Sequence, residues 1–194
     1  MNKIINQPPS ICSIDASTNT IAFAFYLNKQ LTQYGKINFK GNNIYEKTID
    51  ATVKVKSFFE HYNKTDAVVI EHTVFMNSPK TAADLALVQG AIIGGIGLAG
   101  IKTIGRVSPI TWQSFLGNKK LTKEEQIKIR SLNPNKTASW YKSYERDFRK
   151  KRTIKLLEII YDKKITDYDV ADAAGIGHWA INNWDKAIKF DKEQ

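Results

Sequence analysis

The sequence predicts an α/β domain, and features of the first 70 residues carry that prediction. Two short apolar runs, residues 11–14 and 21–27, flank a small polar turn, which is the pattern of a β-hairpin. A later run, residues 67–70, is continuously apolar, which is typical of a strand covered on both faces. Between them, residues 44–62 carry apolar side chains at helical spacing. Strands of two kinds joined by a helix indicate a sheet with helices packed on it.

Length, composition and charge limit the class of function. The 194 residues suit one domain and are enough to bury a core. The chain has 29 Lys and Arg residues and 19 Asp and Glu residues, so its net charge is +10. This charge favours a polyanionic partner, and nucleic acid is a better candidate than a membrane. The single cysteine, Cys12, excludes an intrachain disulfide and indicates a reducing interior. Because the first residues lack a long apolar core, we predict no signal peptide and a cytoplasmic location.

The remaining elements follow in chain order. Residues 30–39 are expected to form a third strand that closes a meander. Residues 80–101 are the most apolar stretch, but their glycines and Gln89 favour a buried helix, packed on the sheet or on a second copy, over a membrane span. Residues 102–107 predict a strand, and Pro109 opens a short helix. Two further helices are expected, at 152–162 and 166–181.

Carboxylates stand where the predicted buried strands end. Asp15 follows the first strand and Glu71 follows the strand after the first helix, while Asp169 and Asp172 share one face of the last helix. Some of these acids also have a purely structural explanation. Asp is common in turns, which would account for Asp15, and acids in the first turn of a helix capped by Thr166 would interact favourably with the helix dipole. Taken together, four carboxylates need cations, and hard oxygen ligands suit Mg²⁺ or Mn²⁺. Two such ions are the apparatus of phosphodiester hydrolysis, so the pattern predicts a nuclease.

Residues 117–155 hold nearly all of the net charge, with 13 basic and four acidic residues. Trp140, Tyr144 and Phe148 are interleaved with these charges, which favours nucleic acid over a plain solvated face, because rings stack on bases while cations hold phosphates. The cations expected to contact DNA are Lys119, Lys120, Lys142, Arg146, Arg149, Lys150, Lys151 and Arg152.

The order of these motifs resembles that of the RuvC-type Holliday junction resolvases of the ribonuclease H-like superfamily. Residues 14–17, Ile-Asp-Ala-Ser, resemble the family's opening Gly-Ile-Asp-Pro-Gly. Residues 71–76, Glu-His-Thr-Val-Phe-Met, resemble its Glu-Gln-x-Phe-Met with one extra residue, and residues 87–95 resemble its dimer-interface helix. Residues 169–173, Asp-Val-Ala-Asp-Ala, fit its final motif. The resemblance covers most of the chain, and the combination in this order is specific.

The resemblance implies a ribonuclease H-like, five-stranded mixed sheet flanked by helices. It implies one nuclease domain over residues 1–194, with a basic insertion at about 118–149, in a form similar to bacteriophage versions. It further implies a homodimer that makes paired nicks in a four-way (Holliday) junction and other branched DNA. Such a phage protein would act in the cytoplasm of its bacterial host.

The resemblance also assigns roles to individual residues. Asp15, Glu71, Asp169 and Asp172 would be catalytic and would bind two divalent ions. Lys151 matches a basic residue that would stabilise charge on the scissile phosphate, with a plain phosphate contact as an equal alternative. Trp112 occupies the position where the family usually has another basic residue, and Phe75 would stack on an unpaired base at the crossover unless it packs in the core.

Other classes remain open at this stage. Sugar kinases and actin-like ATPases of the same superfamily also pair an Asp with Ser or Thr in the first hairpin, but they need two such domains and loops richer in glycine. A module that binds branched DNA without cutting it would not need four acids. A ribonuclease H acting on an RNA–DNA hybrid is a further alternative.

Overall fold

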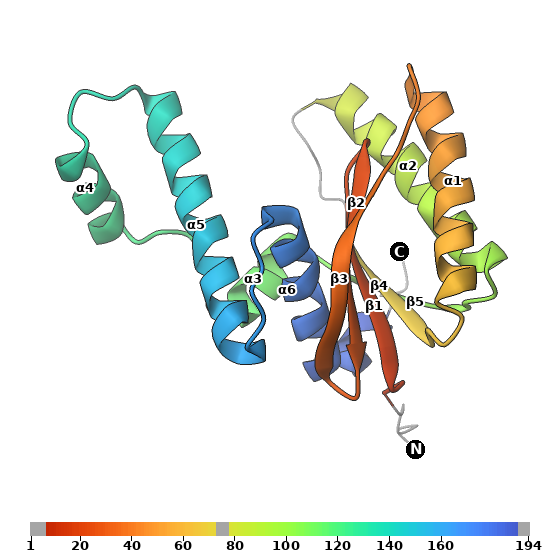
Figure 1. Cartoon of the computed structure of the whole chain (residues 1–194). Helices are drawn as coiled ribbons and strands as arrows, with labels where there is room; N and C mark the ends of the chain where they lie inside the picture. The colour runs from red at the N-terminus through yellow and green to blue at the C-terminus, as the bar shows by residue number, and fades with distance from the viewer. Residues whose placement is uncertain (1–6, 73–77, 190–194) are drawn as a thin grey trace.

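A five-stranded mixed sheet forms the centre of the molecule in the computed structural model, which describes residues 7–72 and 78–189 (Figure 1). The strands are β1 (Ser10–Ala16), β2 (Thr20–Leu27), β3 (Gln30–Asn38), β4 (Ala67–Glu71) and β5 (Thr103–Val107). Their order across the sheet is β3-β2-β1-β4-β5. The β1–β2 and β2–β3 pairs are antiparallel, whereas β1–β4 and β4–β5 are parallel. The predicted fold class, hairpin and meander are confirmed.

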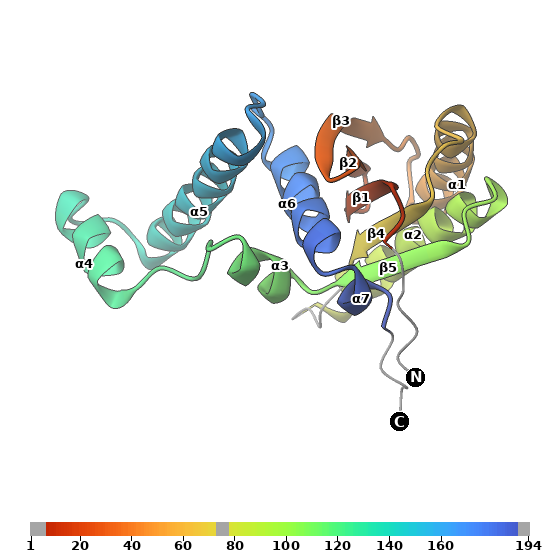
Figure 2. The same cartoon turned by 90° about the horizontal axis from the view of Figure 1, so that it is seen from below.

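Helices cover both faces of this sheet, as Figure 2 shows from below. They are α1 (Ile44–His61), α2 (Pro79–Leu98), α3 (Pro109–Phe115), α4 (Lys123–Leu132), α5 (Ala138–Tyr161), α6 (Tyr168–Asn182) and α7 (Trp184–Ala187). A hydrophobic core lies on each face of the sheet. Val68 of β4 packs with α1 and α2 in one core, and its neighbour Val69 packs with α6 in the other. Burial on both faces explains why the β4 run is continuously apolar.

The region after β5 departs most from the sequence prediction. The helix expected at 152–162 begins at Ala138, so the expected insertion boundary at 149 lies inside α5. Most of α5 is polar and has no regular stripe of buried apolar residues, which is why periodicity revealed only its packed C-terminal end. Further, α4 and α7 were not predicted, and α6 is capped by Asp167 rather than Thr166, since the Asp167 side chain accepts hydrogen bonds from Asp169 and Val170 N–H groups.

The apolar helix α2 packs on α1 through one face. Its buried residues Val88, Ile92 and Ile96 belong to the core under the sheet, and Gly95 lets the two helices approach closely, since a Cβ there would lie 2.9 Å from the Thr52 carbonyl oxygen. Among the described helices, α2 is long and apolar enough to cross a membrane by length and composition, a property that core helices of soluble proteins share. Its opposite face is exposed.

Candidate active site

Two parallel strands bring Asp15 and Glu71 to one edge of the sheet. In the β1–β4 pair, Ile14 lies opposite Ile70, so Asp15 and Glu71 are the next residues along two neighbouring strands. Asp15 is near the end of β1 and Glu71 is the last residue of β4. The strand ends therefore gather these carboxylates as the sequence predicted.

Helix α6 adds the other two acids. Small residues let it lie directly on β1 and β2: a Cβ at Gly177 would overlap the Tyr26 ring and the Ser13 hydroxyl. Ser13 Oγ donates to the Ala173 carbonyl at 2.7 Å, and Tyr26 OH donates to the Ala174 carbonyl at 2.6 Å. These bonds fix the N-terminal half of α6 over the strand that carries Asp15.

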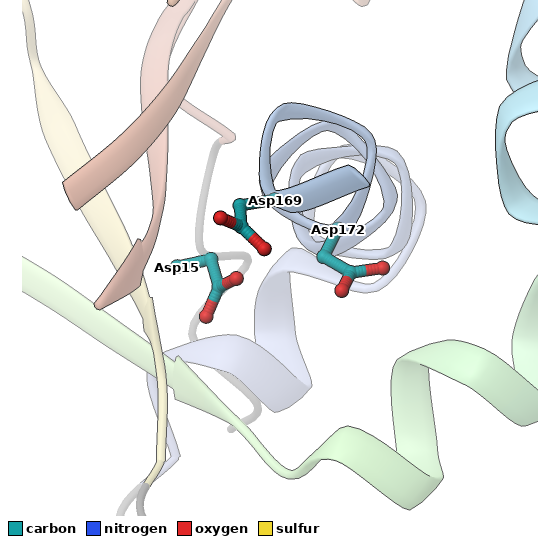
Figure 3. Close-up of side chains that lie close together, drawn as sticks. All are labelled: Asp15, Asp169 and Asp172. Carbon is teal, nitrogen blue, oxygen red and sulfur yellow. The ribbon is translucent and has the colours of Figure 1, made fainter. Parts of the chain in front are cut away.

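Three carboxylates lie close together in the resulting space, as Figure 3 shows. Asp15, Asp169 and Asp172 each offer an oxygen atom, and these atoms all lie within 4.8 Å of one another. Asp169 and Asp172 are three residues apart on α6 and project from one face of it. The structure thus brings together three of the four predicted acids from two elements that are more than 150 residues apart.

Glu71 borders this cluster and is held by a tryptophan. The Trp112 indole N–H of α3 donates to Glu71 Oε1 at 2.6 Å, and the Trp112 ring is 1% exposed. Gly175 of α6 makes room for the ring, because a Cβ there would lie 2.6 Å from it. Trp112 therefore gives Glu71 a neutral hydrogen-bond donor. The family that the sequence resembles usually has a basic residue at this position.

Crowding of acids shifts their proton affinities. Burial, followed by the charges of Glu71, Asp172 and Asp169, raises the pKa of Asp15 to about 8. Burial raises the pKa of Asp172 to about 6 although Lys150 opposes the shift. Burial likewise raises the pKa of Glu71, against the effect of the Trp112 hydrogen bond. These carboxyls therefore resist being ionised together, and a bound cation would favour their charged forms.

Two lysines approach the acids from outside. Lys36 of β3 pairs with Asp169 at 2.7 Å and with Asp167 at 2.8 Å. Lys150 of α5 lies 3.2 Å from Asp169 Oδ1 and 3.4 Å from Asp172 Oδ2. Burial acts to raise the pKa of Asp169, but the hydrogen bonds from these lysines outweigh burial and hold it below its usual value.

The basic residue at the acids is Lys150, where the resemblance assigned Lys151. One step along an α-helix turns the side chain by about 100°, so Lys151 faces away from Lys150 and is exposed. Lys36 was missed altogether. Its role depends on β3 lying beside the start of α6, and a lone lysine in a predicted strand gives no sign of that neighbour.

The other predicted DNA contacts lie on or beside α5. Lys120, Lys142, Arg146 and Arg149 line a groove between α4 and α5, and Lys119 lies beside it in a second hollow against α3. Arg149 is partly buried and donates to Gln113 Oε1, while Arg152 pairs with Glu125 at 2.6 Å. Phe75 lies outside the described residues.

Comparisons with known proteins agree with this architecture. No family model matches the sequence, and no curated protein matches it either. Among solved structures, Thermus thermophilus RuvC in complex with a Holliday junction substrate matches with a TM-score of 0.65 and 13% identity, over 93% of this chain and 99% of that one. This chain has the RuvC-like fold.

Two other structures support the assignment of the RuvC-like fold. A second structure of Thermus thermophilus RuvC matches with a TM-score of 0.63 and 13% identity, over 92% of this chain and 97% of that one. The yeast mitochondrial Holliday junction resolvase Ydc2 matches with a TM-score of 0.51 and 11% identity, over 90% of this chain and 79% of that one. At such identities the likeness concerns the fold, and the residues of the site carry the functional argument.

Proposed function

We propose that the chain is a divalent-metal-dependent endonuclease that resolves four-way and other branched DNA by paired nicking. The observation that carries the proposal is the convergence of Asp15, Asp169 and Asp172 within 4.8 Å, bordered by Glu71, at the sheet edge of a RuvC-like fold. A basic surface on α5 leads to the same place. An acidic centre on a protein of net charge +10 suits attack on a phosphodiester.

The donor set fits Mg²⁺ or Mn²⁺. The cluster offers carboxylate oxygens alone, which are the ligands that these hard cations prefer. Asp15, Asp169 and Asp172 would hold one ion, and Glu71 would share a second with the cluster. Bound ions would supply an activated water and stabilise the leaving oxygen. The raised pKa of Asp15 supports this assignment, since a divalent cation is what would keep that carboxyl ionised at neutral pH.

Lys150 is the cation we assign to the scissile phosphate. Its ammonium group already lies within 3.4 Å of Asp172 and is half-buried, so it is held at the reacting centre. A fixed positive charge there stabilises negative charge that develops on the phosphate. Lys151, exposed on another face of α5, remains a candidate for DNA binding rather than for chemistry.

The groove between α4 and α5 would hold a DNA arm through its phosphates. Lys120, Lys142 and Arg146 line it, and the same helix reaches the carboxylates one to two turns later at Lys150. A backbone lying in this groove is thereby led to the acids. Such contacts carry little sequence information, so this groove would bind different branched substrates alike.

The exposed face of α2 would form a homodimer. Leu87, Ile93 and Leu98 are 45%, 44% and 64% exposed, and a Cβ at Gly90 or Gly94 would meet open space. An apolar helix face with small residues suits close packing on a second copy. A twofold dimer would place one site on each of the two symmetry-related scissile bonds of a junction.

We propose that residues 1–194 act as one nuclease domain, with α4 and the first half of α5 as its basic insertion. Cys12 is a free, buried thiol in β1, which fits the reducing cytoplasm of a cell or of a phage host.

One experiment tests the function directly. Purified protein is incubated with a mobile four-way junction, a replication fork, a flap and an RNA–DNA hybrid, each with Mg²⁺, Mn²⁺ or EDTA. We expect paired nicks in the junction with either metal and none in EDTA. Asp172→Asn is the matched control against a contaminating nuclease. Binding without nicks would support the non-cleaving alternative, and cleavage confined to the hybrid would support a ribonuclease H.

A further inference from the structure

Helix α5 carries two different surfaces along its length. One is the basic groove with α4, lined by Lys142, Arg146 and Arg149. The other is an outer stripe formed by Trp140, Tyr144 and Phe148, which are spaced four residues apart and so lie along one side of the helix. The groove belongs to the function proposed above, whereas that function assigns no role to the stripe.

The aromatic stripe is exposed and bracketed by cations. Trp140 and Tyr144 stack with ring centroids 5.0 Å apart and planes at 25°, and Tyr144 and Phe148 are 38% and 39% exposed. Lys136 Nζ lies 5.7 Å from the Trp140 ring, and the Arg152 guanidinium lies 5.1 Å from the Phe148 ring. Large rings on a surface are costly in water, so their alignment favours a binding role.

Exposed lysines continue the stripe toward the C-terminal end of α5. Lys151 follows Phe148 by three residues and Lys155 follows Lys151 by four, and both are exposed. Asp147, at the edge of this face, pairs with Arg146 at 3.9 Å. Aromatic rings followed by exposed ammonium groups are the combination that binds single-stranded nucleic acid, since bases stack while phosphates are neutralised.

The groove and the stripe cannot contact the same DNA segment. Lys142 and Arg146 lie two positions after Trp140 and Tyr144, which is a rotation of about 200° around the helix. A duplex in the groove would therefore leave the stripe uncovered.

We propose that the outer stripe of α5 binds unpaired nucleotides, so that α5 stands between two DNA strands at a branch point. The proposal rests on the proposed function, because a branched substrate supplies both the duplex arm for the groove and the unpaired bases for the stripe. The lysines Lys136, Lys151 and Lys155 along the stripe favour DNA over a protein as its occupant. Lys150 and Lys151 then have different roles. Lys150 acts at the reacting centre, and Lys151 contacts the phosphates of the unpaired nucleotides.

Single-strand binding provides the test. The variant Tyr144→Ala/Phe148→Ala is compared with Ile127→Ala/Leu132→Ala, which removes two apolar side chains of α4 that are 66% and 70% exposed. Fluorescence anisotropy with labelled oligo-dT is measured in EDTA, so that no cleavage occurs. We expect the stripe variant to bind oligo-dT at least about fivefold more weakly than wild type, and the α4 variant to bind like wild type.

Duplex binding gives the opposite pattern. Lys142→Ala/Arg146→Ala should flatten the salt dependence of duplex affinity, by about 0.9 in the log–log slope for each phosphate that the variant no longer neutralises. The stripe variant should leave that slope unchanged. On a junction with 2-aminopurine at the crossover, wild type should increase the fluorescence, and the stripe variant should not.

Two outcomes would overturn the proposal. In one, the stripe variant binds oligo-dT as tightly as wild type. In the other, it loses self-association while keeping oligo-dT affinity, which would make the stripe a protein interface. Either result leaves the nuclease function intact if junctions are still cut. Conversely, a protein that binds oligo-dT through Tyr144 and Phe148 but never nicks DNA would refute the nuclease function alone.

Discussion

Replacing Trp112 by Phe removes one hydrogen bond from the candidate active site while keeping an aromatic ring in the core. The indole N–H is the donor to Glu71 Oε1 at 2.6 Å, and the ring is enclosed beside Gly175. Phe fills part of the same space but offers no N–H group. The variant therefore isolates the contribution of the donor that orients the Glu71 carboxylate.

The size of the effect follows from the chemistry of this bond. A hydrogen bond to a charged group contributes about 1.5–3 kcal/mol. Loss of a partner that orients a metal ligand weakens metal affinity or activity by about 10- to 100-fold. We expect Trp112→Phe to raise the dissociation constant for Mn²⁺ within that range, and to raise the Mg²⁺ concentration at half-maximal nicking in parallel.

Trp179→Phe provides the matched control. Trp179 is 4% exposed in the same core cluster, and the described residues include no acid that accepts a hydrogen bond from its indole. The loss of ring volume is then common to both variants, and melting temperatures measure it. Isothermal titration with Mn²⁺ gives the affinity without any dependence on cleavage. If Trp112→Phe and Trp179→Phe bind Mn²⁺ equally well, Trp112 fills space and does not orient Glu71.

Four further predictions concern the acids, the lysine at β3 and the dimer. Asp15→Asn and Asp172→Asn should each abolish nicking yet leave junction binding intact in a mobility-shift assay, because removing negative charge does not weaken attraction to DNA. Lys36→Met should raise Mn²⁺ affinity in a calorimetric titration, because the lysine competes for Asp169. Leu98→Glu should yield monomers by light scattering at a concentration where wild type is dimeric. Without metal, the free energy of unfolding should fall from pH 5 to pH 8, because Asp15 keeps its proton up to a pKa of about 8 when folded and loses it near pH 4 when unfolded. Urea titrations should show a smaller fall in Asp15→Asn.

The fold was predictable where burial leaves a mark on the sequence. The strand β4 is enclosed on both faces and reads as a continuous apolar run, while α1 shows its packed face at helical spacing. The predicted elements from β1 to α3 therefore agree with the structure in order and nearly in bounds. The first half of α5 was not predicted because much of it lies against solvent and α4. A helix without a stripe of buried apolar residues gives no periodic signal in the sequence.

The candidate site was predictable as far as chemistry depends on residue type. Asp15, Asp169 and Asp172 stood out because carboxylates at apolar element ends are costly without a partner. Lys36 and the Trp112–Glu71 bond did not stand out, because each joins elements that are distant in the sequence. Lys151 was assigned from the resemblance, although Lys150 lies four residues before Ile154 and seven before Leu157 and so shares the packed face of α5.

Neutral contacts as well as ion pairs hold Asp172 close to Asp15. Ser13 and Tyr26 donate to carbonyls of Ala173 and Ala174, directly after Asp172, so α6 would remain anchored on β1 and β2 even if the acids repelled each other. A buried hydrogen bond of this kind contributes about 1 kcal/mol, and neither partner titrates near neutral pH. Replacing one carboxyl by an amide therefore removes a charge without moving the scaffold, which is why Asp15→Asn separates chemistry from folding.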